Sequence, residues 1–155
     1  MFNNEMAFKK IINDPYQVVD EMVEGIVLAH SDLLKFANNN KRAVVRKDAP
    51  IKDKVGVLIG GGSGHEPAFL GYVGKGLADG AAIGNVFASP SPDPIVDATK
   101  AINGGKGVVY MYGNYAGDIM NFDMAAEMCQ MEDIPVKTVL VTDDIASAPL
   151  DKKSE

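Results

Sequence analysis

The sequence predicts an α/β domain with a mostly parallel sheet and helices on both faces, a three-layer sandwich. Segments of strand character alternate with helical patterns from residue 55 to residue 141. Such alternation calls for crossover connections that lay helices over a parallel sheet. The length of 155 residues is enough for one domain with its own core. We therefore expect a single domain over residues 1–155, in which residues 1–8 form a flexible arm.

The composition excludes several classes of function. The apolar fraction of 46% and the charged fraction of 23% are ordinary for a globular protein. The formal net charge of −6 argues against nucleic acid as a partner, because no basic surface could neutralise phosphates. No segment reaches the roughly 18 apolar residues of a membrane helix, and no signal-peptide pattern is present. The single cysteine, Cys129, suits a reducing compartment. We expect a cytoplasmic protein in which Cys129 is packed rather than nucleophilic.

The first elements are a helix and a short strand. Apolar residues recur at helical spacing up to His30, Asp14 could cap this helix, and Pro15 suits its first position. His30 is expected to be an exposed imidazole at the helix end. A turn at residues 38–40 then leads to a short strand at residues 43–45, placed at an edge of the sheet.

The central strand, residues 55–59, leads into the stretch GGGSGHEP at residues 60–67. Four glycines in five positions allow positive φ and let a ligand approach main-chain N–H groups. A following helix would direct its N-terminal N–H groups to the same place. The stretch is neither the dinucleotide fingerprint nor a P-loop. A turn whose glycines only avoid clashes is the alternative, but Ser63 and His65 in one turn favour a site.

The remaining chain continues the alternation. The expected elements are a short helix near residues 69–73, a strand at 81–87, a rigid turn at 88–94 with a helix after it, a strand at 108–112, a helix at 119–131 and a strand at 136–141. Met120, Met124 and Met128 recur every four residues in the last helix, which predicts a stripe packed in the core.

Four turns are expected to meet where the parallel strands end, which is where such sheets bind ligands. They cover residues 60–66, 87–93, 113–118 and 142–147. His65 and Asp118 lie in two of them and could share a pocket. Asp118 could instead cap the helix that follows it. Beside a histidine, its carboxylate could orient the ring or take a proton. Asn114 and Ser63 are candidate hydrogen-bond partners for substrate hydroxyls.

A metal site is not expected. Asp143 and Asp144 could bind a cation, but a solvated loop is the simpler interpretation, and no paired His or Cys residues stand at ligand spacing. The residues alone therefore predict a small polar ligand at the carboxyl edge of the sheet, with acid–base assistance.

Three motifs in this order resemble the dihydroxyacetone (glycerone) kinase family, in its substrate-binding DhaK subunit or domain. They are GGGSGHEP at residues 60–67, FASPSPD at 87–93 and NYAGDIMNF at 114–122. The pair DP at 14–15 and the run DDIA at 143–146 fit the same family in the same order. The resemblance spans roughly residues 9–155.

The resemblance implies a kinase part that acts on the terminal hydroxyl of a short-chain ketose, dihydroxyacetone or a tetrulose. It implies that His65 is a hydrogen-bond partner of that hydroxyl and that Asp118 is the general base. Substrate contacts would come from Gly61, Gly62, Ser63, Gly64, His65, Asn114 and Asp118. This chain would bind no cofactor, because ATP or a phosphotransferase-system donor acts from a separate helical domain or subunit of the DhaL type. The family also implies a homodimer.

Two features depart from the family pattern. The covalent histidine, which holds the ketose carbonyl as a hemiaminal, belongs to a second half beyond residue 155. The resemblance thus implies the amino-terminal half of a longer protein, inactive on its own. Many relatives also carry lysine where this chain has Gly113, which leaves the ketose open. The alternatives are a non-catalytic ketose-binding or regulatory module and a plain nucleotide-binding domain.

Overall fold

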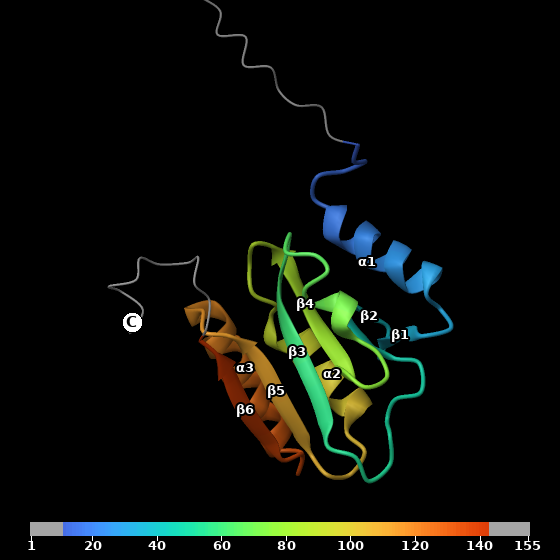
Figure 1. Ribbon diagram of the computed structural model, residues 1–155. Helices are drawn as coiled ribbons and strands as arrows, with labels where there is room; N and C mark the ends of the chain where they lie inside the picture. The colour runs from blue at the N-terminus through green and yellow to red at the C-terminus, as the bar shows by residue number, and fades with distance from the viewer. Residues whose placement is uncertain (1–10, 143–155) are drawn as a thin grey trace, which may run out of the picture.

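A computed structural model describes residues 11–142 and shows one mixed sheet with helices on both faces (Figure 1). The elements are α1 (Val18–Ala29), β1 (Leu34–Ala37), β2 (Asn40–Arg46), β3 (Gly56–Ser63), the 3-10 helix η1 (Leu70–Tyr72), β4 (Gly80–Val86), α2 (Pro92–Ile102), β5 (Val108–Gly113), α3 (Ala116–Gln130) and β6 (Val136–Val141). The six strands lie in the order β1-β2-β4-β3-β5-β6. The last four strands in this order are parallel to one another, whereas β2 runs antiparallel to both of its neighbours, β1 and β4. The predicted α/β class is confirmed.

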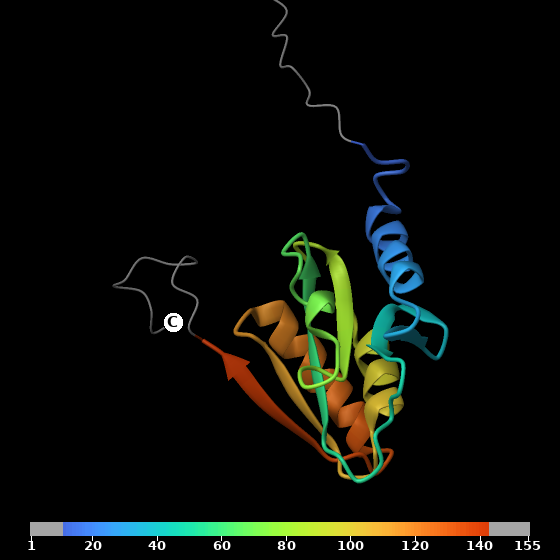
Figure 2. The same ribbon diagram turned by 45° about the vertical axis from the view of Figure 1, so that its right-hand side comes forward.

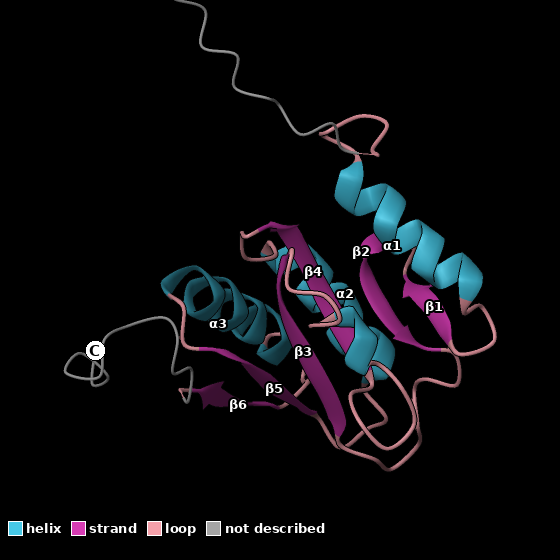
Figure 3. Cartoon of the chain, turned by 45° about the horizontal axis from the view of Figure 1, so that its top comes forward, coloured by secondary structure: helices cyan, strands magenta, loops and turns pink. Residues whose placement is uncertain are grey.

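The two faces of the sheet carry separate hydrophobic cores. Along β4, Ala81 and Ile83 face the core that α1 and η1 cover, whereas Ala82 faces the core under α2 and α3. This alternation follows from the two-residue period of a strand. Figure 3 shows α2 and α3 side by side on one face, with α1 on the other. In the turned view of Figure 2, β5 and β6 run together along the edge remote from α1.

The predicted first helix is confirmed, but it begins at Val18 and not directly after Asp14, the predicted cap. The residue before α1 is Gln17, and it makes no side-chain cap. Asp14 instead accepts a hydrogen bond from the Tyr16 N–H at 2.9 Å, which forms a turn before the helix. His30 follows the last helical residue and is exposed, as predicted.

The predicted edge position of residues 43–45 is wrong. They belong to β2, which lies between β1 and β4. The edge strand is β1, whose four residues were too few to give a readable pattern. The turn predicted at residues 38–40 is confirmed, since Asn38 and Asn39 join β1 to β2 with φ of 48° and 59°. Two successive positive φ angles suit a tight hairpin, and Asn tolerates them.

The methionine stripe predicted for the core is wrong for two of its three members. Met120 is 62% exposed and Met124 is 49% exposed, while Met128 packs partly against the core. The helix α3 instead buries Phe122, Ala125 and Cys129. The Phe122 ring stacks on Tyr112 of β5 at a centroid distance of 4.1 Å, and this fixes which face turns inward. The packed state predicted for Cys129 is confirmed.

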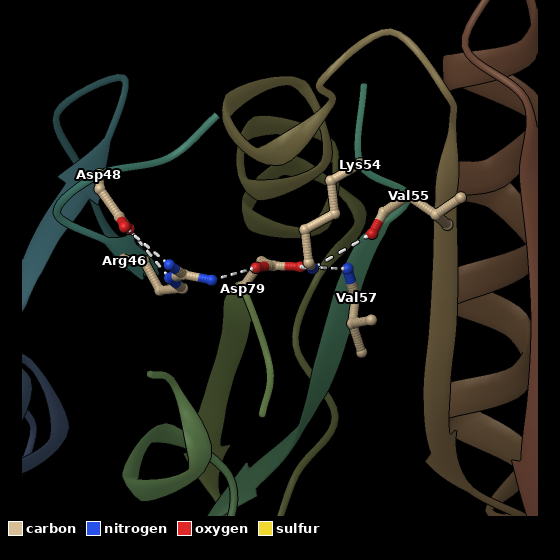
Figure 4. A network of polar contacts seen from close by, with 6 residues as sticks. All are labelled: Arg46, Asp48, Lys54, Val55, Val57 and Asp79. Carbon is tan, nitrogen blue, oxygen red and sulfur yellow. Dashed lines mark hydrogen bonds and ion pairs between the residues drawn. The ribbon is translucent and has the colours of Figure 1, made fainter. Parts of the chain in front are cut away.

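An ionic cluster with a buried centre, Arg46 and Asp79, joins three strands at the end of the sheet where β3 and β4 begin (Figure 4). Asp79 is 2% exposed and accepts hydrogen bonds from Arg46 and from the Val57 N–H, each at 2.9 Å. Lys54 completes the ion pairs to this carboxylate, and Asp48 pairs with the other side of Arg46. The carboxylate therefore connects β2, β3 and the start of β4.

Two predictions fall outside the described residues, namely the flexible arm at 1–8 and the acidic pair Asp143 and Asp144. Within residues 11–142, no helix combines the length and the apolar character needed to cross a membrane.

Candidate active site

The glycine stretch is part of a strand rather than the turn that was predicted. Residues 60–63 continue β3, where Gly60 pairs with Ala82 and Gly61 with Ile83 of β4. The turn starts only at Gly64, whose φ of +99° favours glycine. The cause is tertiary, because β4 pairs with this part of β3, whereas β5 pairs only with the preceding residues 56–59.

The glycines of β3 are required by close packing. A Cβ on Gly60 would lie 2.7 Å from the Ala82 carbonyl oxygen, and one on Gly62 would lie 2.8 Å from the Ala88 nitrogen. A Cβ on Gly61 would overlap the Phe69 ring. These residues therefore let the loop after β4 and the Phe69 ring approach the carboxyl end of β3.

The helix N-terminus expected behind the glycines is not there. Residues 64–79 contain only η1, a single 3-10 turn, which confirms the short helix predicted near residues 69–73. This turn is too short to direct the N–H groups of a helix N-terminus at the glycine stretch. In the structure, the Gly64 N–H donates to both oxygens of the Glu66 carboxylate, at 3.1 Å to Oε1 and 2.9 Å to Oε2.

A cavity of about 660 Å³ opens at the carboxyl ends of β3 and β5. The chain passes from β3 to β4 on one side and then returns to β5 on the other, so the cavity lies at a switch point of the sheet. Its walls come from Ile59, Gly62, His65, Ala68, Phe69, Tyr72, Phe87, Ala88, Ser89, Met111, Tyr112, Gly113, Tyr115, Asp118 and Val141. Three of the four turns expected to converge contribute to it, while the fourth begins only at the end of the described chain.

The cavity brings together some of the predicted site residues. His65, Gly62 and Asp118 line it, although 65 and 118 are far apart in the sequence. The Ser63 hydroxyl is buried and donates to the Gly84 carbonyl at 2.9 Å, so it joins β3 to β4. Asn114 is exposed and anchors the turn after β5, since its N–H donates to the Val141 carbonyl at 3.1 Å. Gly61, Ser63, Gly64 and Asn114 are not among the residues that form the cavity wall.

Asp118 is the buried acid of this cavity. It is the third residue of α3 and is 6% exposed. The residue before the helix is Tyr115, so the alternative that Asp118 caps α3 is wrong. Burial raises the pKa of the Asp118 carboxyl, while a hydrogen bond with Ser89 and the charge of a nearby His65 imidazolium act in the opposite direction. Asp118 Oδ1 has no hydrogen-bond partner among residues 11–142. It is therefore placed to accept a proton from a bound group.

Two aromatic rings flank His65 at the cavity. Phe87 meets the imidazole edge-on at a centroid distance of 5.1 Å, and Phe69 lies at 6.5 Å. The Tyr115 ring covers Gly113, where an added Cβ would meet it at 3.0 Å. A side chain at position 113 would therefore have to displace Tyr115 to enter the cavity.

No role was predicted from the sequence for Phe87, Ser89 or Tyr115. Phe87 and Ser89 stand in the predicted turn after the strand at 81–87, and Tyr115 stands in the turn after the strand at 108–112. Their position at the carboxyl edge was the only signal available. In the part of the chain that the structure covers, no three His, Cys, Asp or Glu side chains gather closely enough to hold a metal ion.

A family model described as the Dak1 domain matches residues 24–155. The chain belongs to the Dak1 domain family. This membership agrees with the resemblance drawn from the three motifs, and the Dak1 cavity described above lies where those motifs meet.

Relatives of this Dak1 chain are named as ketose kinases or their subunits. The dihydroxyacetone-binding subunit DhaK of the PTS-dependent dihydroxyacetone kinase 2 of Listeria innocua is 55% identical over 140 residues, which are 90% of this chain and 42% of that subunit. The L-erythrulose kinase of Pectobacterium atrosepticum is 44% identical over 92% of this chain and 24% of its own.

A solved structure of similar fold comes from the same group of kinases. The native crystal structure of the dihydroxyacetone kinase of C. freundii matches with a TM-score of 0.83 and 37% identity, covering 93% of this chain and 27% of that one. The Dak1 chain thus spans less than half the length of the proteins it matches.

Proposed function

We propose that this chain is the substrate-binding part of a ketose kinase and that Asp118 is its general base. The observation that carries the proposal is the buried Asp118 carboxylate, whose Oδ1 lacks a partner among the described residues and which lies beside His65 in one cavity. Membership of the Dak1 family and the kinase names of its relatives support it.

The chemistry follows from these two groups. His65 hydrogen-bonds the terminal hydroxyl of the ketose, and Asp118 takes the hydroxyl proton as the oxygen attacks phosphorus. The new bond joins that oxygen to phosphorus, and the bond between phosphorus and the donor breaks. A base works best when its pKa lies near the working pH, and burial shifts the pKa of Asp118 in that direction.

The substrate is a short-chain ketose, dihydroxyacetone or a tetrulose. Tyr115 over Gly113 gives the cavity an uncharged aromatic wall at this point. Ser63, Gly61, Gly62, Gly64 and Asn114 are proposed to shape or contact the ketose site. The donor is ATP or a phosphotransferase-system protein and acts from a separate helical domain or DhaL-type subunit. A cytoplasmic homodimer completes the proposal.

The test is phosphoryl transfer to dihydroxyacetone and to erythrulose by the full gene product with its donor partner. Asp118→Asn should lower kcat by about 10²–10⁴-fold, the usual range for a general acid or base. Glu127→Gln is the matched control, because Glu127 is an exposed carboxylate of the same helix. Unchanged transfer in Asp118→Asn would overturn the general base. Ketose binding without transfer in the unaltered protein would overturn the kinase and favour the non-catalytic module.

A further inference from the structure

We propose that Phe87 is a positioning residue, whose ring holds the His65 imidazole at the cavity. The inference rests on the proposed function for its consequence in catalysis. The contact itself, between a loop after β4 and a turn after β3, stands on geometry alone.

Phe87 has two features that are unfavourable for an aromatic residue. Its φ is +51°, a conformation that bulky side chains rarely adopt, and its side chain is 71% exposed. The Phe87 N–H donates to the Ser63 carbonyl at 2.8 Å, which anchors this backbone to the last residue of β3. Unfavourable conformations of this kind persist where the surrounding structure imposes them, and they cluster at functional sites.

The ring of Phe87 is directed at the histidine. The two rings meet at a centroid distance of 5.1 Å and an interplanar angle of 65°, the edge-to-face arrangement that aromatic pairs favour. Gly64 makes the approach possible, because a Cβ there would lie 2.8 Å from Phe87 Cε1. The positive φ of Gly64 and that of Phe87 thus serve the same contact.

The contact matters because His65 is itself exposed and lies in a turn. An imidazole without a neighbour would sample several rotamers, and only some of them would face a hydroxyl bound beside Asp118. Phe69 flanks the ring more loosely, at 6.5 Å. Phe87 therefore supplies the closer of the two restraints, and small misplacements of a catalytic group lower rates strongly.

The variants follow from the backbone. Phe87→Asn removes the ring and suits a positive φ, since Asn adopts it readily. Phe87→Tyr keeps the ring. Leu77→Asn is the matched control, because Leu77 is a 60% exposed apolar residue outside the cavity wall. Phe87→Gly provides a second variant without a ring that also suits the backbone.

The first measurement is the NMR spectrum of the histidine rings in the 155-residue chain. It has two histidines, and His30 at the end of α1 serves as an internal reference. We expect the His65 ring-proton signals to shift toward those of a free imidazole in Phe87→Asn and Phe87→Gly and to stay in place in Phe87→Tyr. The His30 signals should stay constant in all three variants. Unshifted His65 signals in both variants without the ring would overturn the proposal.

The second measurement is kcat in the full gene product with its donor partner. Phe87→Asn should lower kcat by about 10- to 100-fold, Phe87→Tyr should retain most of it, and Leu77→Asn should leave it unchanged. Equal losses in the Asn and Tyr variants would contradict positioning by the ring. If Asp118→Asn retained full activity, the general-base role of Asp118 would fail, yet the shift of the His65 signals would still decide whether Phe87 holds the ring.

Discussion

The side-chain amide of Asn121 donates a hydrogen bond to the Pro90 carbonyl at 2.8 Å. This contact connects α3 to the loop between β4 and α2, which carries Phe87 and Ser89. Asn121 lies one helical turn after Asp118. The acid and the loop that faces it are therefore held together by a bond outside the cavity itself.

Loss of this bond should loosen the loop. Asn121→Ala is expected to lower the free energy of unfolding by about 1 kcal/mol, the usual net contribution of one hydrogen bond. Urea unfolding measures it. Gln130→Ala, at an exposed position at the end of α3, is the control and should change little. Equal effects of the two substitutions would show that the bond to Pro90 contributes nothing.

Asp118 should make stability depend on pH. Burial raises its pKa, so the folded state binds the proton more tightly than the unfolded chain does. The stability it contributes is fully present below the unfolded pKa, near 4, and is lost as pH rises through the raised folded pKa.

Asp118→Asn should therefore raise Tm by a few degrees at pH 7, and this gain should shrink as pH falls toward 4. Thermal unfolding at both pH values tests it, with the exposed Glu127→Gln as the control. A higher Tm for the unaltered chain at pH 7 would contradict the expected cost of burying this carboxylate.

Two glycines should respond in opposite directions to alanine. In Gly60→Ala the new Cβ would meet the Ala82 carbonyl oxygen and the Phe122 ring, so we expect a loss of about 1–3 kcal/mol from overpacking. In Gly25→Ala the Cβ of this α1 residue has no atom within 4 Å, and a gain of about 0.5–1 kcal/mol is expected inside a helix. Chemical denaturation of both variants measures the difference. Tolerance of alanine at position 60 would mean that β3 and β4 are less closely packed than described.

The Asp79 cluster should dominate the stability of the other end of the sheet. Asp79→Ala leaves the Arg46 guanidinium, whose side chain is 8% exposed, without its buried partner. Breaking a buried ion pair from one side costs about 3–5 kcal/mol. Asp48→Ala removes the exposed partner of the same arginine and should cost far less. Denaturant unfolding compares the two, and equal losses would show that burial does not distinguish them.

Much of the fold was readable from local patterns. The strands at 81–87, 108–112 and 136–141 and the helix that buries Ile95 and Ile102 were predicted within a few residues, because runs of apolar residues and helical spacing are local signals. The strand β1 was missed because four residues carry too little periodicity. The buried face of α3 was misassigned because two sets of residues repeat at helical spacing, the methionines and the set Phe122, Ala125 and Cys129. The stacking of Phe122 on the Tyr112 ring determines which of the two faces the core.

The sequence by itself determined the α/β class, the order of the elements from residue 55 onward and the placement of His65 and Asp118 shortly after two different strands. It could do so because parallel strands all end at one edge, so residues after different strands must meet there. The tertiary structure decided that residues 60–63 are strand, since their ladder partners come from β4, a later segment of the chain. It also decided the neighbours of the two groups, Phe87 beside His65 and Ser89 beside Asp118, because these contacts depend on how a later loop packs against β3 and α3.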